Sequence, residues 1–340
     1  MTSAQTHSNQ ILLTGMSGVF GAGLARSLAG LDLATPDGGQ AGAKNPGSLS
    51  LHIGGRQQPA AWQGYAFTQL DLMRPGALAQ WIREQQPQAV LHAAAMARPA
   101  ECEANPSAAW RVNAESAAEA AAACAEVGAR LVFCSTDQVF DGTADSYAEN
   151  APVNPLQVYG QTKVAAEEEV LAHGGVVVRL PLLFGPEGAP GHMGADQALL
   201  EASRRSESIG LFYDEIRAPA DAMLLAPPLW RLLGAADLES AGTSQGEEGA
   251  APSDFSGRIY HLAGSEAVSR HQMGVEVCRA AGIPFEHGRM SVQEWSGVPR
   301  PARLVLTCER AVRELNFQPP DLRQSLARVE ALHSQNKSES

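Results

Sequence analysis

Short runs of apolar residues alternate with longer amphipathic segments over the first 180 residues of the chain. Continuous apolar runs of this length are typical of strands that are buried on both faces of a parallel sheet. Strands that alternate with helices at this spacing predict a doubly wound α/β fold. The expected strands are residues 10–15, 49–53, 66–70, 89–92, 131–134 and 176–180, and the expected helices between them are 22–31, 75–86, 106–127 and a segment through 159–169.

The pattern is less regular after residue 180, where a single further strand is expected at 258–262. We therefore expect residues 181–332 to form mainly a smaller region, with some segments that return to the first domain. Residues 238–257 read as a polar, low-complexity insert, and residues 1–9 and 333–340 as flexible ends. The expected helices are 195–206, 222–233, 269–281, 307–315 and 322–332.

The length, charge and cysteine content of the chain limit the expected domains, partners and location. With 340 residues the chain can form one large domain or two unequal ones. Its formal charge of −12 argues against nucleic acid or an anionic membrane surface as a partner. The sequence contains neither a signal peptide nor an 18-residue apolar span, so the expected location is the cytoplasm. The five cysteines lack zinc-site spacing, which favours reduced, packed thiols and no metal site.

A glycine-rich turn directly follows the first expected strand. Gly15, Gly18 and Gly21 stand at three-residue intervals before the first helix. Glycines at such a turn let the backbone approach a pyrophosphate, and the helix N-terminus supplies N–H groups. The spacing differs from the commoner G-x-G-x-x-G pattern, and a merely flexible turn is the alternative interpretation.

The residue that ends the second strand bears on which dinucleotide is bound. An acidic residue there would hold the ribose 2′-hydroxyl of NAD, whereas an arginine suits the 2′-phosphate of NADP. Arg56 follows this strand, so the sequence favours NADP(H) over NAD(H). A plain surface arginine is the alternative.

A tyrosine and a lysine four residues apart provide candidate chemistry. Tyr159 and Lys163 share one face of a predicted helix. A nearby ammonium is expected to lower the pKa of a phenol, which makes the pair a workable proton donor. The hydroxyl of Thr136, at the end of the preceding strand, could hold a carbonyl oxygen against that phenol. Although a Tyr-x-x-x-Lys pair alone can arise by chance, the glycine turn and Thr136 favour a functional role.

Taken together, these motifs resemble the extended short-chain dehydrogenase/reductase family, in its dTDP-4-dehydrorhamnose reductase-like, sugar-nucleotide-binding branch. The resemblance covers nearly the whole chain and implies a Rossmann-type NAD(P)-binding domain over residues 1–180, with the substrate bound mainly by residues 181–332. It is carried by Thr14-Gly15-Met16-Ser17-Gly18-Val19-Phe20-Gly21, His92-Ala93-Ala94-Ala95, Arg111-Val112-Asn113, Ser135-Thr136-Asp137-Gln138-Val139-Phe140-Asp141-Gly142, Tyr159-Gly160-Gln161-Thr162-Lys163, Ile259-Tyr260-His261-Leu262-Ala263-Gly264 and Arg300-Pro301-Ala302-Arg303.

The resemblance implies a role for each matching position. Thr136, Tyr159 and Lys163 would be catalytic: Tyr159 donates the proton, Thr136 binds the substrate oxygen, and Lys163 binds the nicotinamide ribose. The nicotinamide would give a hydride to a ketone carbon while the phenol protonates the alkoxide. Asn113 is expected to support a strand rather than react. The implied cofactor-binding residues are Gly15, Ser17, Gly18, Val19, Phe20, Gly21, Arg56, Asp71, Leu72, Ala93, Ala94, Ala95, Tyr159 and Lys163.

Several positions leave alternatives open. Gln138 stands where this branch usually has tyrosine and where related dehydratases have a catalytic glutamate, so 4,6-dehydration is disfavoured and epimerisation stays open. Asp137 is a candidate substrate contact or a turn cap. Arg217 is a candidate ligand for a nucleotide phosphate or a surface ion-pair partner. His92 ends a buried strand and is expected to be structural.

Two functions follow from the sequence. The first is an NAD(P)H-dependent reductase of a carbonyl substrate, with a nucleotide-linked 4-keto-sugar as the favoured substrate. The second is an NADP-binding regulatory or partner subunit that resembles the β subunit of methionine adenosyltransferase. The expected partner is a small molecule rather than nucleic acid or a membrane, and a homodimer is compatible with the sequence but not required by it.

Overall fold

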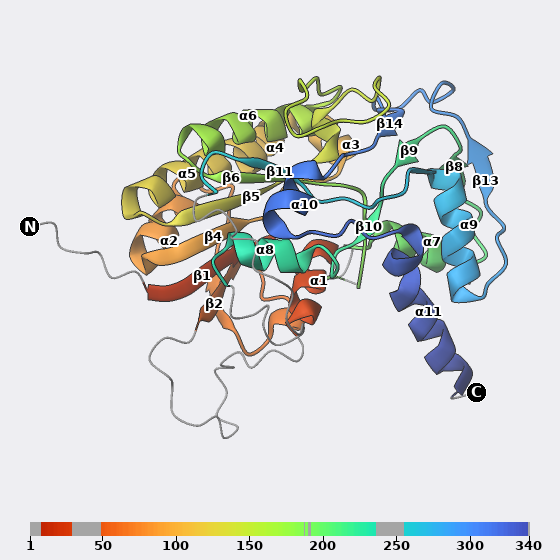
Figure 1. Ribbon diagram of the computed structural model, residues 1–340, viewed down its shortest axis with the longest axis horizontal. Helices are drawn as coiled ribbons and strands as arrows, with labels where there is room; N and C mark the ends of the chain where they lie inside the picture. Colours follow the sequence, from red (N-terminus) through yellow and green to blue (C-terminus); the bar gives the residue numbers. More distant parts are fainter. Residues whose placement is uncertain (1–7, 29–48, 187, 190–191, 236–254, 339–340) are drawn as a thin grey trace, which may run out of the picture.

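The computed structural model describes residues 8–28, 49–186, 188–189, 192–235 and 255–338. A seven-stranded sheet in the order β11-β6-β5-β4-β1-β2-β3 forms its centre (Figure 1). Every strand pair in this sheet is parallel, which confirms the predicted Rossmann-type, doubly wound α/β fold. The strands are β1 (Ser8–Thr14), β2 (Ser50–Gly55), β3 (Ala66–Gln69), β4 (Pro87–His92), β5 (Arg130–Thr136), β6 (Val176–Leu180) and β11 (Ile259–His261).

Alternate side chains of each central strand enter two different cores. In β1, Ile11 and Leu13 join one core while Leu12 joins the other. The first core is covered by α1 (Val19–Ser27), α8 (Ala226–Leu232) and α10 (Glu309–Leu315). The second is covered by α2 (Ala77–Gln85), α5 (Ser116–Val127) and α6 (Val158–Ala172). Both faces of the sheet are therefore buried, as the continuous apolar runs predict.

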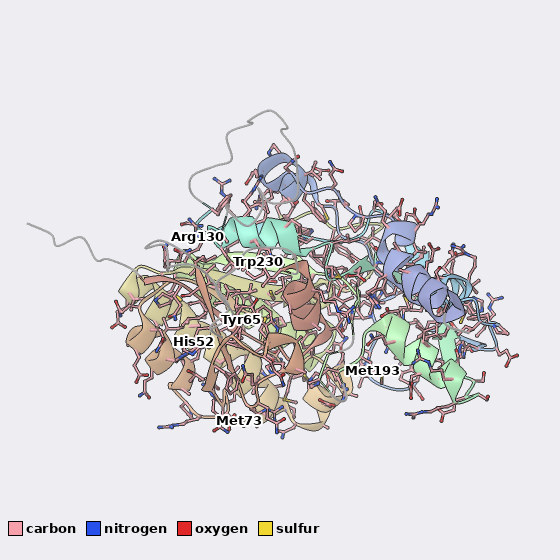
Figure 2. All side chains as sticks on the ribbon, turned by 90° about the horizontal axis from the view of Figure 1, so that it is seen from below. His52, Tyr65, Met73, Arg130, Met193 and Trp230 are labelled. Carbon is pink, nitrogen blue, oxygen red and sulfur yellow. The ribbon has the colours of Figure 1, made fainter. Side chains whose placement is uncertain are left out.

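Helix α8 comes from the later part of the chain but packs onto the first domain. The indole nitrogen of Trp230 donates to the hydroxyl of Ser27, 3.2 Å away, at the end of α1 (Figure 2). Arg130, at the start of β5, donates to the carbonyl of Leu232 over 3.0 Å. The contacts of α8 with α1 and β5 thus join segments that are more than 100 residues apart in the sequence.

A smaller region lies beyond the carboxyl end of the sheet. Three helices enclose its own apolar core, α7 (Ala195–Arg204), α9 (Arg270–Ala281) and α11 (Leu322–Ser338), on the right of Figure 1. Its short strands are β7 (Leu183–Phe184), β8 (Gly210–Phe212), β9 (Ile216–Arg217), β10 (Ala220–Asp221), β12 (Val268–Ser269), β13 (Gly288–Met290) and β14 (Arg303–Leu304).

Some sequence predictions differ from the structure. The helix expected at 106–127 is divided into α4 (Pro106–Ala109), a π-helical turn (Trp110–Glu115) and α5. The last helix continues to Ser338 instead of ending at residue 332. Phe255, assigned to the polar insert, is buried in the first core and packs edgewise on Tyr260. Residues 1–7 and insert residues 238–254 lie outside the described residues.

The remaining expectations concern cysteines and membranes. All five cysteines are free and buried, as expected for packed thiols. In the ranges that the structure describes, no helix has both the length and the apolar character needed to cross a membrane.

Candidate active site

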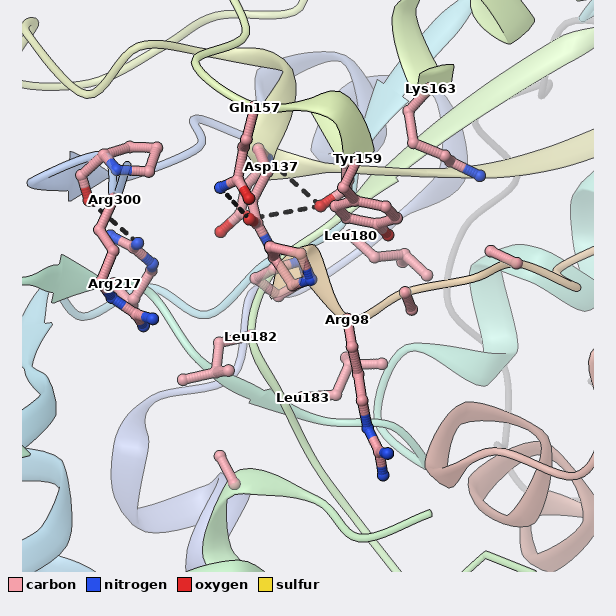
Figure 3. A pocket seen from close by; sticks show the side chains of 18 of the residues that line it. Arg98, Asp137, Gln157, Tyr159, Lys163, Leu180, Leu182, Leu183, Arg217 and Arg300 are labelled. Atoms are coloured by element: carbon pink, nitrogen blue, oxygen red, sulfur yellow. Dashed lines mark hydrogen bonds between the residues drawn. The ribbon is translucent and has the colours of Figure 1, made fainter. Parts of the chain in front are cut away.

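A cavity of about 590 Å³ opens at the carboxyl end of the sheet, between the two regions (Figure 3). Residues from β5, α6, β9 and α9 line it together with the first residues of α1. In doubly wound folds, ligands bind beyond the carboxyl ends of the strands, where the strand order reverses. Here that reversal falls between β1 and β4, next to the cavity.

One side of the cavity, the tyrosine wall, consists of Thr136, Asp137, Gln157, Tyr159 and Lys163. The first two residues come from the end of β5 and the turn that follows it, and the others come from the start of α6. The structure therefore brings the three predicted catalytic residues to one surface (Figure 3).

Burial determines the protonation of the phenol. Tyr159 is 7% exposed, and this burial raises its pKa above the usual value. A hydrogen bond with the hydroxyl of Thr136 acts in the opposite direction but is the weaker influence. The expectation of a lowered pKa is therefore wrong for this structure. A phenol that keeps its proton at neutral pH is nevertheless the form that a proton donor requires.

Lys163 is fully buried beside the phenol. Its ammonium donates to the carbonyl of Cys134 over 2.6 Å and lies 3.9 Å from the centre of the Phe133 ring. Burial lowers the pKa of Lys163 to about 8, although Cys134 and Glu167 raise it. The lysine is thus fixed by the strand in front of it and is charged at neutral pH.

Two acceptor atoms in the tyrosine wall have no partner among the described residues: Oδ2 of Asp137 and Oε1 of Gln157. Both residues are 3% exposed. The other ends of these side chains are held, because Thr136 donates to Oδ1 of Asp137 over 3.3 Å and Gln157 donates to Oε1 of Gln138 over 2.8 Å. Burial raises the pKa of Asp137 to about 6, against the influence of Arg217.

The opposite side of the cavity, the arginine wall, consists of Glu215, Arg217, Arg270 and Arg300. Two guanidinium groups contact the buried Glu215 carboxylate there, and Arg270 attracts it at longer range. Arg300 bonds it over 2.6 and 3.1 Å, and Arg217 lies 3.2 Å from it. Burial lowers the pKa of Arg270 to about 10, although the carboxylate raises it. This wall therefore has an excess of positive charge and suits an anionic group.

The glycine turn leads into Val19 and Phe20 at the start of α1. Gly15 has a φ of +80°, and a Cβ there would lie 2.3 Å from the backbone carbon of Ala93, so only glycine fits. At Gly18, by contrast, a Cβ would meet nothing closer than 3.8 Å. Val19 and Phe20 line the cavity. The space on the Cβ side of Gly18, at a helix N-terminus, suits a pyrophosphate. Gly188 and Ala189 pack against the backbone of Ser17 and Gly18 at the same turn.

The other predicted cofactor residues are divided between the cavity and its surroundings. Ala93 and Ala95 line the cavity, whereas Ala94 packs against the second core. Gly21 packs against Met16 in the first turn of α1. The carbonyl of Ser17 accepts a hydrogen bond of 2.8 Å from the Ala189 amide.

Three further predicted positions follow β2 and β3, outside the lining of the cavity. Arg56 is exposed at the end of β2. The exposed Asp71 accepts a hydrogen bond of 3.0 Å from the Met73 amide. Leu72 is buried, and its carbonyl accepts from Arg111 over 3.0 Å.

His92 and Asn113 have structural contacts. His92 is buried, its ring nitrogens lie 2.7 Å from Thr14 Oγ1 and 3.2 Å from Ser116 Oγ, and burial lowers its pKa to about 3. The Asn113 side chain bonds both the amide and the carbonyl of Met96, and it donates to Thr162 over 3.0 Å. Asn113 therefore fixes α6 to the loop after β4, rather than a strand. It does so from the π-helical turn, a feature common at functional sites.

The sequence analysis gave no site role to several residues that line the cavity, among them Gln157, Glu215, Trp295, Arg270 and Arg300. Of these, Arg300 stands in one of the matching motifs. Gln157 stands two residues before Tyr159, so a polar residue next to the motif was an available signal. Glu215 and Arg217 alternate along one extended segment and could have been paired. Nothing in the local sequence distinguishes Arg270 from a surface arginine.

Comparisons with known proteins place the chain among similar sequences and structures. Residues 9–334 match the family described as RmlD substrate binding domain. The chain is 28% identical to dTDP-4-dehydrorhamnose reductase of Burkholderia thailandensis over 326 residues, 92% of this chain and 95% of that protein. It is also 28% identical to methionine adenosyltransferase 2 subunit beta of Bos taurus over 249 residues, 72% of this chain and 70% of that protein.

A solved structure resembles the fold. It is dTDP-4-dehydrorhamnose reductase of Bacillus anthracis in complex with NADP, with a TM-score of 0.72 and 21% identity. The match covers 95% of this chain and 99% of that one. At this identity the likeness concerns the fold.

Proposed function

Because the chain belongs to the RmlD substrate binding domain family, we propose that it is an NADPH-dependent reductase of a nucleotide-linked 4-keto-sugar. The observation that carries the proposal is that Thr136, Tyr159 and Lys163 form one buried surface of a cavity. The glycine turn leads directly into Val19 and Phe20, which line the same cavity.

NADP(H) fits the residues at the start of α1. The backbone at Gly18 would take the pyrophosphate, Val19, Phe20, Ala93 and Ala95 would line the cofactor, and Lys163 would hold the nicotinamide ribose. Arg56, at the end of β2, is the proposed contact for the 2′-phosphate. The bound nicotinamide would supply the hydride that reduces the carbonyl carbon.

The chain's own residues bind the carbonyl oxygen of the substrate and donate a proton to it. Thr136 and Tyr159 hold the carbonyl oxygen between two hydroxyl groups. The Thr136 hydroxyl has a single proton, which turns from Oδ1 of Asp137 to the carbonyl oxygen when the substrate binds. As negative charge develops on that oxygen, the phenol transfers its proton to it. The raised pKa of Tyr159 keeps the phenol protonated until then, and the ammonium of Lys163 stabilises the phenolate that remains.

The arginine wall would bind the nucleotide diphosphate. Guanidinium groups bind phosphate oxygens through paired N–H donors. Arg217 and Arg300 line the cavity, where Figure 3 labels them, and both contact the Glu215 carboxylate. The region after residue 181 would thus supply most of the substrate contacts.

NADPH oxidation with a panel of nucleotide-linked ketoses, led by dTDP-4-dehydrorhamnose, tests the proposal. Wild type should oxidise NADPH with at least one of them, whereas Tyr159→Phe should lose about 10²–10⁴-fold in kcat. NADPH binding, followed by cofactor fluorescence, should be retained in the variant. No turnover in wild type, or equal turnover in both proteins, would contradict the proposal.

A second candidate is an NADP-binding partner subunit. The observation in its favour is the similarity to methionine adenosyltransferase 2 subunit beta. On this hypothesis, NADPH binds without turnover and Tyr159→Phe changes nothing. Epimerisation, the other enzymatic alternative, would change the sugar without net NADPH consumption, which product analysis detects.

A homodimer and a cytoplasmic location stay predictions of the sequence. Light scattering of the purified protein and microscopy of a tagged chain would measure them.

A further inference from the structure

Asp137 and Gln157 line the cavity, and each has one buried acceptor atom without a partner among the described residues. These atoms are Oδ2 of Asp137 and Oε1 of Gln157. Both side chains line the cavity and lie near Tyr159 in Figure 3. A buried polar atom without a partner costs about 1–3 kcal/mol, so most are satisfied in native proteins.

Neighbouring groups fix the direction of both acceptors. Thr136 donates to Oδ1 of Asp137, and the amide of Gln157 donates to Oε1 of Gln138. One end of each side chain is thus occupied, and the free oxygen is the end that remains for a ligand. Two acceptors require two donors, and neighbouring hydroxyl groups of a sugar ring provide them.

We propose that Asp137 and Gln157 recognise two hydroxyl groups of the substrate, so that a hydroxylated ketone is bound and its deoxy analogues are rejected. This inference rests on the proposed function for the position of the carbonyl. Because Asp137 bonds Thr136, which holds the carbonyl oxygen, Asp137 binds the hydroxyl on the carbon next to the carbonyl. Gln157 binds the following hydroxyl.

The same donor chemistry could come from the ribose of the cofactor. Cofactor binding therefore has to be measured separately from sugar binding. The arginine wall does not compete for this role, since its guanidinium groups only donate hydrogen bonds and its one carboxylate, Glu215, is already engaged by Arg300 and Arg217.

Calorimetric titration of the protein, saturated with NADP⁺, with dTDP-glucose and its 2-deoxy and 3-deoxy analogues tests the inference without requiring turnover. Wild type should bind dTDP-glucose about 10–100-fold more tightly than either analogue. In Asp137→Asn the preference over the 3-deoxy sugar should fall to a few-fold. In Gln157→Leu the preference over the 2-deoxy sugar should disappear.

Two further variants separate recognition from folding. Gln138→Leu keeps the Gln157 acceptor but removes its anchor, and should reduce the 2-deoxy preference only partly. Gln161→Leu changes an exposed residue of the same helix and should bind all three sugars as wild type does. NADPH affinity should be the same in every variant.

The outcomes distinguish this inference from the proposed function. If no ketose is reduced but the deoxy preferences follow the pattern above, the inference stands and the proposed reaction fails. Equal binding of all three sugars by wild type, or no binding, overturns the inference. So does a loss of NADPH affinity in the Asp137 and Gln157 variants with sugar preference unchanged, because the hydroxyls would then belong to the cofactor.

Discussion

The tyrosine wall and the arginine wall both contain buried polar groups, but they differ in how far these groups are paired with one another. In the arginine wall, the Glu215 carboxylate bonds Arg300 and pairs with Arg217. In the tyrosine wall, Asp137 and Gln157 each retain an oxygen without a partner in the part of the chain that the structure describes, and burial raises the pKa of Asp137 and Tyr159. The first wall is stabilised by its own contacts, whereas the second is left incomplete for a ligand. Groups with perturbed pKa values and unmet hydrogen bonds mark the chemistry here.

The largest expected change in stability comes from removing the carboxylate of the arginine wall. Glu215→Ala removes the carboxylate that two guanidinium groups contact, and leaving buried charge unpaired should lower the free energy of unfolding by about 3–5 kcal/mol. Denaturant unfolding measures the change. Glu201→Ala is the matched control, because Glu201 pairs with the exposed Arg204 and Arg205. That loss should stay below about 1 kcal/mol, and similar losses in both variants would contradict the comparison.

The next prediction is a gain in stability and concerns Asp137 in the tyrosine wall. Burial raises the pKa of Asp137 from 3.8 to about 6, outweighing Arg217, which lowers it, while Glu215 raises it further. The folded state therefore binds this proton more tightly than the unfolded state, and wild-type stability is lost as the pH rises from about 4 through 6.

Asp137→Asn should remove the decrease in stability that wild type shows as the pH rises. The variant should match wild type below about pH 4 and be more stable by up to about 3 kcal/mol above pH 7. Thermal unfolding across this range measures the difference. A variant that is destabilised at every pH would show that the Asp137 carboxylate supports the fold.

A smaller effect concerns binding to the arginine wall. Arg217→Met should weaken dTDP binding about 10–100-fold, because it removes charged hydrogen bonds of about 1.5–3 kcal/mol. Calorimetry measures this, with Arg205→Met, an exposed arginine, as the control. Tyr159→Phe should leave dTDP binding unchanged. An equal loss in Tyr159→Phe would mean that the two walls do not divide the substrate as proposed.

The smallest effect lies outside both walls. Arg56→Ala should raise the KM for NADPH about tenfold and leave the KM for NADH unchanged, since only NADPH has the 2′-phosphate. Steady-state kinetics with both cofactors measure the ratio. Unchanged selectivity would make Arg56 a surface residue.

The sequence predicted the central sheet, and it predicted that Tyr159 and Lys163 share a helix, because both features depend on local patterns. Apolar runs predict buried strands, and Tyr159 and Lys163 share a helix face through their spacing alone. The raised pKa of Tyr159 could not be predicted in this way. It depends on how deeply the phenol is buried, which is a tertiary property.

The arginine wall shows the limit of local patterns. Glu215 and Arg217 lie near β9, Arg270 begins α9, and Arg300 precedes β14. These segments meet only because β9 pairs with both β12 and β14. The pairing of two-residue strands has no signal in the sequence, so the cluster was visible only in the fold.

The pairing of β11 with β6 has a consequence for dissecting the protein. Residues 259–261 supply the outermost strand beside β6, and α8 and α10 cover one face of the same sheet. A fragment that stops at residue 180 would expose a bare strand edge and uncovered leucines, which favours aggregation. Residue 180, the predicted end of the NAD(P)-binding domain, is therefore unsuitable as a truncation point. This domain is expected to fold only after the ribosome has synthesised the chain beyond residue 315.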